Sequence, residues 1–229
     1  MKIVKLLSLL MLKVIKIFRL IEFYQPSYNP HGSILLGKND HKRNCEDRFN
    51  LIKNNIEPKE INSYLDIGSQ IGYFVFKMAE LNPRLVAQGV EMERVSCAYA
   101  NNLTLFNGVA NVSFINAKMS VEFARAMPSY DLISFLSVFH HIAHFEGFTA
   151  ADSIMQELHR KCQRYFIFET GQYDEKGYYW SESLKFMGED PLSWINEYLR
   201  QIGYKEVRLL ATVGTHLSEN KRGIFLCRK

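Results

Sequence analysis

From residue 62 onward, short apolar runs alternate with longer stretches in which apolar residues recur at helical spacing. The short runs have the length and bounding turn residues of buried strands, and the longer stretches have the period of amphipathic helices. We predict strands over residues 63–68, 84–91, 111–116, 130–137, 164–170, 205–212 and 222–228. We predict helices over residues 72–82, 94–107, 119–126, 148–161 and 190–202.

Strands that alternate with helices predict an α/β fold, in which a mostly parallel sheet is covered by helices on both faces. The last two predicted strands are joined by VGTHLSENK, which contains no helix, so they should pair antiparallel at one edge of the sheet. Ligands of such sheets bind beyond the carboxyl ends of the strands. The residues that should build the site follow Leu65, Val90, Phe114, Phe135 and Phe168.

Residues 1–24 form a separate amphipathic segment, for which we predict a helix. At ~100° per residue, its basic residues fall within a stripe about 120° wide, and most other positions are apolar. The basic residues are Lys2, Lys5, Lys13, Lys16 and Arg19. No charge-free run approaches the roughly 20 residues that cross a bilayer, and no small-residue cleavage site follows the apolar core.

Two interpretations of this segment stay open. A helix with one basic side and one broad apolar side suits the interface of an anionic membrane. The same helix could instead pack on the domain or on a second subunit of a homo-oligomer. Pro26, Pro30 and Gly32 then begin a linker. We therefore divide the chain into the helix at 1–24, a linker and N-terminal helix over the site at 25–61, and the main domain at 62–229.

Composition narrows the class of protein. The 229 residues suit one large domain, or a domain with a terminal appendage. The formal charge of +4 lies entirely in residues 1–24, so the rest of the chain is neutral and is not expected to bind long nucleic acid. The cysteines form no CxxC pair, which argues against a disulfide framework and fits a reducing cytoplasm. They are Cys45, Cys97, Cys162 and Cys227. We expect a cytoplasmic protein, peripheral on the inner face of the membrane if residues 1–24 bind lipid.

The stretch YLDIGSQIGYF follows the first predicted strand and opens a helix. Asp66, Gly68 and Gly72 form a D-x-G-x-x-x-G turn, and Glu91 ends the second strand, where a carboxylate can accept ribose hydroxyls. A dinucleotide site would need glycine at Gln70, and Asp66 would oppose a phosphate. The acid suits the positively charged end of S-adenosylmethionine instead. In the alternative interpretation, Asp66 only caps the turn and Glu91 is a solvated strand end.

This turn, the GVE that ends the second strand and the order of seven strands resemble class I S-adenosylmethionine-dependent methyltransferases, which have a Rossmann-like fold. A more specific resemblance, over roughly residues 32 to 228, is to the methyltransferase domain of bacterial O-antigen chain-length terminators. The stretches that carry it are RNCEDRFNLI, FLSVFHHIAHFEG, YFIFETGQ…YYW and THLSENKRGIFL. Those proteins cap a polysaccharide by methylating its end, in some cases on a phosphate. We expect no kinase domain, of the kind that bifunctional members carry, after Lys229.

The resemblance implies a set of cofactor contacts. Asp66 and Glu91 would hold the charged end and the ribose of S-adenosylmethionine, and Ala117 would border the adenine. The other implied cofactor residues are Gly68, Ser69, Gln70, Gly72, Met92, Lys118, Met119, Ser137 and Val138. An acceptor hydroxyl would need a base to remove its proton, whereas an acceptor phosphate would need cationic groups to position it.

The stretch SVFHHIAHFEG holds three histidines after the fourth strand, at the mouth of the expected site. Consecutive His140 and His141 point in different directions, and Glu146 is the only acidic partner nearby, so we expect no metal. We predict that at least one of His140 and His141 acts as a base or contacts the acceptor. We interpret His144 as a surface or packing histidine.

Other candidates for acceptor binding are less specific. Arg43 and Arg48 could bind the cofactor carboxylate or an anionic acceptor, or could lie on a solvated helix face. Glu169 ends the fifth strand, which is a functional position, although it could simply pair with a neighbouring cation.

Two further groups of candidates lie in the stretches that carry the resemblance. Tyr178, Tyr179 and Trp180 could stack on a sugar ring or cover the core as a lid. His216 and Arg222 in the last hairpin would reach the site if that loop folds back.

We therefore expect a methyltransferase that uses S-adenosylmethionine and acts on a glycan hydroxyl or a glycan-linked phosphate in cell-surface polysaccharide biosynthesis. An RNA or small-molecule methyltransferase and a noncatalytic partner subunit stay open as alternatives. A nicotinamide oxidoreductase is disfavoured by Asp66 and Gln70.

Overall fold

The computed structural model describes residues 2–34, 44–215 and 220–229. The strands are β1 (Ser63–Ile67), β2 (Val86–Glu91), β3 (Val112–Asn116), β4 (Tyr130–Leu136), β5 (Cys162–Glu169), β6 (Glu206–Gly214) and β7 (Lys221–Arg228). The α-helices are α1 (Lys2–Ile17), α2 (Cys45–Lys53), α3 (Tyr73–Leu81), α4 (Arg94–Asn107), α5 (Val121–Ala126), α6 (Phe139–Phe145), α7 (Phe148–Lys161) and α8 (Pro191–Ile202). Two 3₁₀ segments, η2 (Pro58–Glu60) and η3 (Ser181–Met187), complete the described elements. Each predicted strand and helix of the main domain lies within a few residues of its observed bounds.

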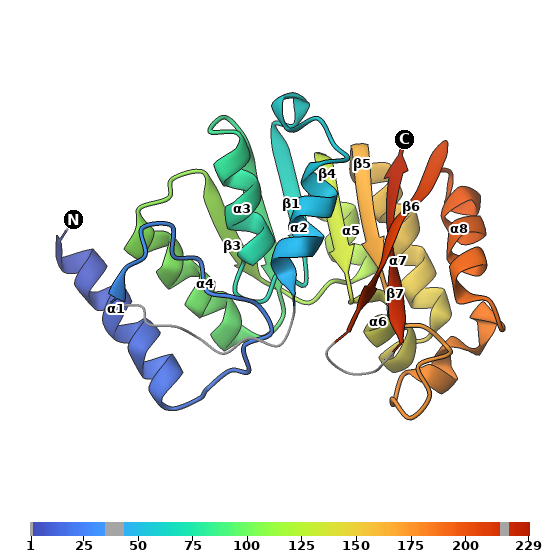
Figure 1. Ribbon diagram of the computed structural model, residues 1–229, viewed down its shortest axis with the longest axis horizontal. Coiled ribbons are helices and arrows are strands. Elements are labelled where there is room, and N and C mark those ends of the chain that lie inside the picture. Colours follow the sequence, from blue (N-terminus) through green and yellow to red (C-terminus); the bar gives the residue numbers. More distant parts are fainter. Residues whose placement is uncertain (1, 35–43, 216–219) are drawn as a thin grey trace.

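The strands form one sheet in the order β3-β2-β1-β4-β5-β7-β6. Neighbours from β3 to β5 are parallel, and β7 pairs antiparallel with both β5 and β6. The predicted antiparallel pairing of the last two strands at one edge is therefore confirmed. The carboxyl ends of the parallel strands meet at one edge, toward the bottom of Figure 1.

Alternation along each strand divides the core into two layers, because successive side chains point to opposite faces of the sheet. In β1, Tyr64 packs with the apolar residues of α2, α3 and α4, whereas Leu65 packs with those of α5, α7 and α8. Both side chains are almost fully buried. The sheet is therefore covered by helices on both faces, as predicted (Figure 1).

The N-terminal helix α1 lies outside this three-layer body and packs against α4 (Figure 1). Its Leu9, Leu12 and Ile15 join the core around α4. The helix ends at Ile17, not at residue 24 as predicted, and Arg19 has a left-handed backbone with φ 49°. The difference has a tertiary cause, since the residues after Arg19 turn back toward the sheet and pack beside the site.

Candidate active site

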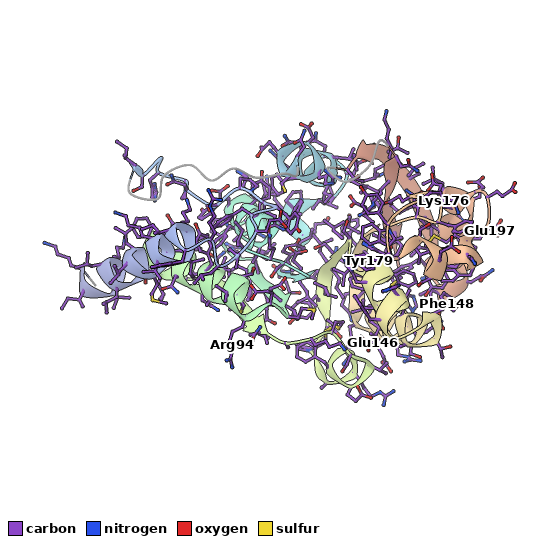
Figure 2. All side chains as sticks on the ribbon, turned by 90° about the horizontal axis from the view of Figure 1, so that it is seen from below. Arg94, Glu146, Phe148, Lys176, Tyr179 and Glu197 are labelled. Carbon is purple, nitrogen blue, oxygen red and sulfur yellow. The ribbon has the colours of Figure 1, made fainter. Side chains whose placement is uncertain are left out.

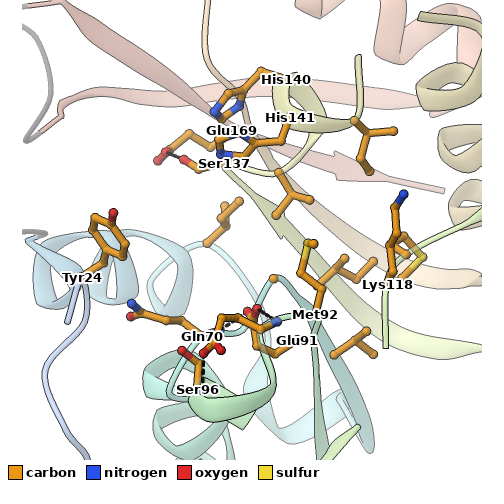
Figure 3. A pocket seen from close by; sticks show the side chains of 18 of the residues that line it. Tyr24, Gln70, Glu91, Met92, Ser96, Lys118, Ser137, His140, His141 and Glu169 are labelled. Carbon is orange, nitrogen blue, oxygen red and sulfur yellow. Dashed lines mark hydrogen bonds between the residues drawn. The ribbon is translucent and has the colours of Figure 1, made fainter. Parts of the chain in front are cut away.

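A cavity of about 1150 Å³ lies at the carboxyl ends of β1, β2, β4 and β5. Its wall includes the turn after each of these strands, residues 117–119 after β3, part of α6 and residues 20–25 of the N-terminal segment. Figure 3 shows two groups of side chains facing each other across it. Gln70, Glu91, Met92 and Ser96 lie on one side, and Ser137, His140, His141 and Glu169 lie on the other. We call these the nucleoside half and the acceptor half.

The nucleoside half begins with the turn between β1 and α3. Gly68, Gln70 and Gly72 all have positive φ, at 75°, 48° and 85°. Glycine adopts this conformation without steric cost, whereas Gln70 needs support from its neighbours. A Cβ on Gly68 would lie 2.4 Å from Cγ2 of Val138, so glycine is needed where the turn after β1 meets the segment after β4. The turn is therefore shaped for close backbone contact with a ligand.

Glu91 is the central carboxylate of the nucleoside half. Its Oε2 accepts a 2.8 Å hydrogen bond from the backbone N–H of Gln70, and its Oε1 accepts a 2.7 Å bond from that of Glu93. Burial raises the pKa of Glu91, although these backbone donors oppose the shift. Both oxygens are thus fixed at the cavity wall with lone pairs left to accept further hydroxyl groups. The structure does not support the alternative that Glu91 is a solvated strand end, because the residue is buried.

Gln70 connects this turn to the N-terminal segment. Its Nε2 donates to the carbonyl of Glu22 at 2.7 Å, and its Oε1 accepts from the backbone N–H of Gln25 at 3.1 Å. Gln25 in turn accepts from the backbone N–H of Tyr73 at 2.9 Å. The residue that replaces a dinucleotide-type glycine therefore fixes residues 20–25 as a wall of the cavity, a role that the sequence pattern does not reveal.

Several predicted cofactor residues line the cavity, and others lie behind its wall. Gly68, Gln70, Glu91, Met92, Lys118, Met119, Ser137 and Val138 line it. Asp66, Ser69 and Gly72 do not. Asp66 is buried within β1 and accepts a 2.5 Å hydrogen bond from the Ser134 hydroxyl. Asp66 therefore lies behind the cavity wall, and its contact with the cofactor stays a prediction. Arg43 lies outside the described residues, as does His216 among the acceptor candidates.

His140 forms part of the acceptor half and is almost fully buried. Its Nδ1 accepts a 2.9 Å hydrogen bond from the backbone N–H of Gly171. An Nδ1 that accepts cannot carry a proton, so neutral His140 holds its proton on Nε2. In this arrangement His140 can donate a hydrogen bond, and it cannot act as a base through Nε2.

His141 follows on α6 and has a different environment. Its Nδ1 lies 2.7 Å from the hydroxyl of Tyr179, which can donate or accept. Burial, followed by the charge of Arg222, lowers the pKa of His141 to about 4. The ring is therefore neutral at pH 7. If its Nδ1–H donates to Tyr179, the lone pair on Nε2 is free to accept a proton.

A buried ion pair lies at the base of the acceptor half. Nε of Arg48 donates to Oε2 of Glu169 at 2.9 Å, and both side chains are almost completely buried. Arg48 also donates to the carbonyls of Asn44 and Gly214. The suggestion that Arg48 lies on a solvated helix face is wrong, because α2 turns this side chain inward to the end of β5. Glu169 does pair with a neighbouring cation, as one interpretation expected.

A second buried pair continues from the first. Arg222 donates to both carboxylate oxygens of Glu175 at 2.7 Å, and its Nη1 donates to the Ser137 hydroxyl at 3.1 Å. Ser137 donates to Oε1 of Glu169 at 2.6 Å, and so joins the two pairs. The two arginines and two glutamates are balanced in charge. Sequence reasoning missed Glu175, which lies in a loop without any periodic pattern that marks burial.

The aromatic residues of the loop after β5 have two different environments. Tyr179 is 53% exposed at the rim, whereas Trp180 is 3% exposed and packs beneath the rings of His140 and His141. Figure 2 shows Tyr179 on the face that holds the strand ends. Trp180 therefore supports the two histidines from the core, and Tyr179 is available for contact with a ligand at the mouth.

The third histidine takes no part in the cavity wall. Nδ1 of His144 lies 2.8 Å from the Ser183 hydroxyl, consistent with a packing role. Over residues 2–34, 44–215 and 220–229, no group of three or more His, Cys, Asp or Glu side chains is arranged to hold a metal ion.

The chain is similar to known proteins in sequence and in structure. No protein-family model matches the chain. The sequence is 27% identical over 195 residues to the O-antigen chain terminator bifunctional methyltransferase/kinase WbdD of Escherichia coli, a match that covers 82% of this chain and 25% of that protein. The solved structure of the bifunctional kinase-methyltransferase WbdD matches with a TM-score of 0.75 and 25% identity, over 94% of this chain and 45% of that one. The N-terminal domain of EvdMO1, solved in the presence of SAH and D-fucose, matches with a TM-score of 0.64 and 14% identity, over 93% of this chain and 94% of that one.

The strand order and these matches show that the chain has the class I α/β fold of methyltransferases. More particularly, the chain is similar in sequence and in structure to an O-antigen chain terminator, so the resemblance predicted from its motifs is confirmed. The chain spans 25% of the length of its curated relative WbdD.

Proposed function

We propose that this protein uses S-adenosylmethionine to methylate a hydroxyl group of a glycan in cell-surface polysaccharide biosynthesis. One observation carries the proposal: a single cavity joins a nucleoside half, organised by Glu91, to an acceptor half that contains a neutral histidine. The volume of about 1150 Å³ exceeds what one drug-sized ligand needs, so there is room for a nucleoside and a sugar together.

The nucleoside half fits S-adenosylmethionine better than a dinucleotide. Glu91 would accept the ribose hydroxyls, and the turn at Gly68 would face the methionine arm together with Ser137. Gln70 stands where a pyrophosphate site needs glycine, and its side chain is already engaged by residues 22 and 25. The structural neighbour EvdMO1 was solved with SAH, the demethylated product of this cofactor, which supports the same choice. When bound, the cofactor would supply an electrophilic methyl group.

The balance of charge favours a hydroxyl acceptor over a phosphate. A phosphate clamp needs cations with donors to spare. Here Arg48 is paired with Glu169, Arg222 is paired with both oxygens of Glu175, and His141 is neutral at pH 7. The acceptor half would therefore bind an uncharged group such as a sugar, whose hydrogen-bonding edges and C–H faces suit these polar groups and Tyr179.

The two histidines have separate roles in this proposal. His140 donates from Nε2 to an acceptor oxygen and so orients it, because Gly171 fixes the tautomer. His141 takes the hydroxyl proton at Nε2, while its Nδ1–H donates to Tyr179. The proton then leaves to water through the exposed rim. Trp180 packs against both rings from the core and so supports their positions.

Transfer of labelled methyl groups from S-adenosylmethionine to glycan extracts tests the proposal directly. We expect label in a glycan fraction, with no loss of acceptance when the extract is first treated with phosphatase. If phosphatase treatment abolished the acceptance of label, the acceptor would be a phosphate and not a hydroxyl. Failure of S-adenosylmethionine to bind in calorimetry would overturn the assignment of the cofactor.

A further inference from the structure

The helix α1 has two apolar sides, of which only one is used inside the molecule. Leu9, Leu12 and Ile15 are buried against the core around α4. On the opposite side, the apolar side chains are between 46% and 74% exposed. They are Ile3, Val4, Leu6, Leu7, Leu10, Met11 and Ile17. We call this set the outer face of α1. Scattered exposed apolar residues are ordinary, whereas a contiguous set on one helix marks an interaction surface.

The charged residues of α1 are all of one sign. Lys2, Lys5 and Lys13 are exposed and Lys16 is half-buried, and α1 contains no Asp or Glu. The helix α4, on which α1 packs, contains no Asp or Glu either. At ~100° per residue, the lysines lie on one flank, between the buried side and the outer face. The outer face is thus bordered by cations that no carboxylate of these two helices can neutralise.

We propose that α1 docks in the headgroup region of an anionic membrane, with its outer face among the lipid chains and its lysines at the lipid phosphates. A second copy of the chain is a poorer occupant, because pairing two outer faces would bring two all-cationic helices together. An anionic bilayer supplies both an apolar layer and the opposite charge. Docking here means lying in the interface, since none of the described helices combines the length and apolar content that a crossing requires.

The exposed apolar surface continues from α1 toward the cavity. Phe18, Leu20 and Tyr24 are exposed after the helix ends, and Leu20 and Tyr24 also line the cavity. Figure 1 shows the carboxyl end of α1 at the same end of the molecule as the carboxyl ends of the parallel strands, where the cavity lies. Figure 2 shows α1 projecting at one extremity of that face. A docked α1 would therefore hold this wall of the cavity close to the lipid surface.

Vesicle flotation of the full chain tests the proposal. We expect the protein to float with phosphatidylcholine vesicles that contain phosphatidylglycerol, and to float far less with phosphatidylcholine alone. The variant Leu7→Gln/Leu10→Gln should lower partitioning by at least about 10-fold, because two side chains lose their transfer into lipid. Its control, Leu209→Gln, changes an exposed leucine on β6, at the opposite edge of the sheet from α1, and should float like the wild type.

A second pair of variants separates charge from apolar contact. Lys2→Gln/Lys5→Gln/Lys13→Gln should weaken binding to the anionic vesicles by about 5-fold per lysine, on the order of 100-fold together. The matched control replaces three exposed lysines elsewhere, as Lys53→Gln/Lys59→Gln/Lys205→Gln, and should lose much less. Circular dichroism and calorimetric titration with S-adenosylhomocysteine show that each variant is folded, whatever the acceptor of the enzyme is.

The proposal is overturned if the wild type stays off the anionic vesicles, or if Leu7→Gln/Leu10→Gln floats as well as the wild type. Light scattering identifies the competing occupant. A dimer that dissociates in Leu7→Gln/Leu10→Gln, without vesicle binding by the wild type, would assign the outer face to a second copy of the chain.

Discussion

The nucleoside and acceptor halves of the cavity are built in different ways. The nucleoside half is local, because the turn at Gly68 to Gly72 and the carboxylate of Glu91 lie within one strand–helix–strand unit. The backbone N–H of Gln70 donates to this carboxylate and joins the two. The acceptor half is assembled from distant segments. Arg48 and Glu169 are 121 residues apart in the chain, and Arg222 and Ser137 are 85 apart.

This difference shows where each half is vulnerable. A site formed mainly by the backbone depends on the conformation of the turn, and it tolerates substitution of side chains that do not face the ligand. A site built on buried ion pairs depends on every partner, because removing one charge leaves the other buried without compensation. We therefore expect substitutions in the acceptor half to affect rate or folding, and those in the nucleoside half to affect mainly cofactor affinity.

The largest effect is expected from the base. His141→Gln should lower kcat by about 100- to 10,000-fold, because the acceptor hydroxyl would lose the group that takes its proton. Steady-state kinetics with a glycan acceptor measure this change. His144→Gln, which alters a neighbouring histidine outside the cavity wall, should keep kcat. Equal losses in both variants would point to a disturbed α6 and contradict the assigned role.

The buried ion pair of Arg222 should give the largest change in stability. Glu175→Gln should lower the free energy of unfolding by about 3–5 kcal/mol, because it leaves the guanidinium buried without its carboxylate. Chemical denaturation measures it. The double variant Glu175→Gln/Arg222→Met should recover part of the loss, and a double variant no more stable than the single one would refute this account. Glu182→Gln, at an exposed pair with Lys185, is the control and should change nothing measurable.

A smaller effect is expected in the nucleoside half. Glu91→Gln should weaken binding of S-adenosylmethionine by about 10- to 100-fold, since an amide NH₂ cannot accept the hydrogen bonds that one carboxylate oxygen accepts. Calorimetric titration measures this, and kcat at saturating cofactor should change little. Glu80→Gln on α3, which removes an exposed partner of Lys77, serves as the control. Unchanged affinity in Glu91→Gln would place the ribose elsewhere.

The smallest effect concerns pH. The pKa of His141 falls from its usual 6.5 to about 4 on folding. Between these values the unfolded chain binds a proton that the folded protein does not, so stability falls as the pH is lowered through this window. One such group contributes a slope of at most about 1.4 kcal/mol per pH unit. Urea denaturation at several pH values should show a shallower decline in His141→Gln than in the wild type. Identical declines would mean that His141 titrates normally.

The sequence alone determined the architecture and the nucleoside half. The periodicity of strands and helices can be recognised in short stretches of sequence. Burial of their apolar positions then packs these elements into a sheet covered on both faces. The turn at Gly68 and the acid at Glu91 were recognisable because both lie within one strand–helix–strand unit of the sequence. The histidines on α6 were placed at the mouth of the site for the same reason.

Only the tertiary structure decided the rest. It separated the roles of His140 and His141, because Gly171 and Tyr179 reach them from another segment. It also brought Ser134 to Asp66 and Glu175 to Arg222.

The helix α1 shows the same limit of what its sequence predicts. Its pattern predicted an amphipathic helix with one basic side, and the fold decided which apolar side is buried on α4 and which is left exposed. The physical reason is common to these cases. Periodicity predicts that a side chain is buried. The residue that it contacts depends on distant chain segments, which meet only when the sheet and its helices pack together.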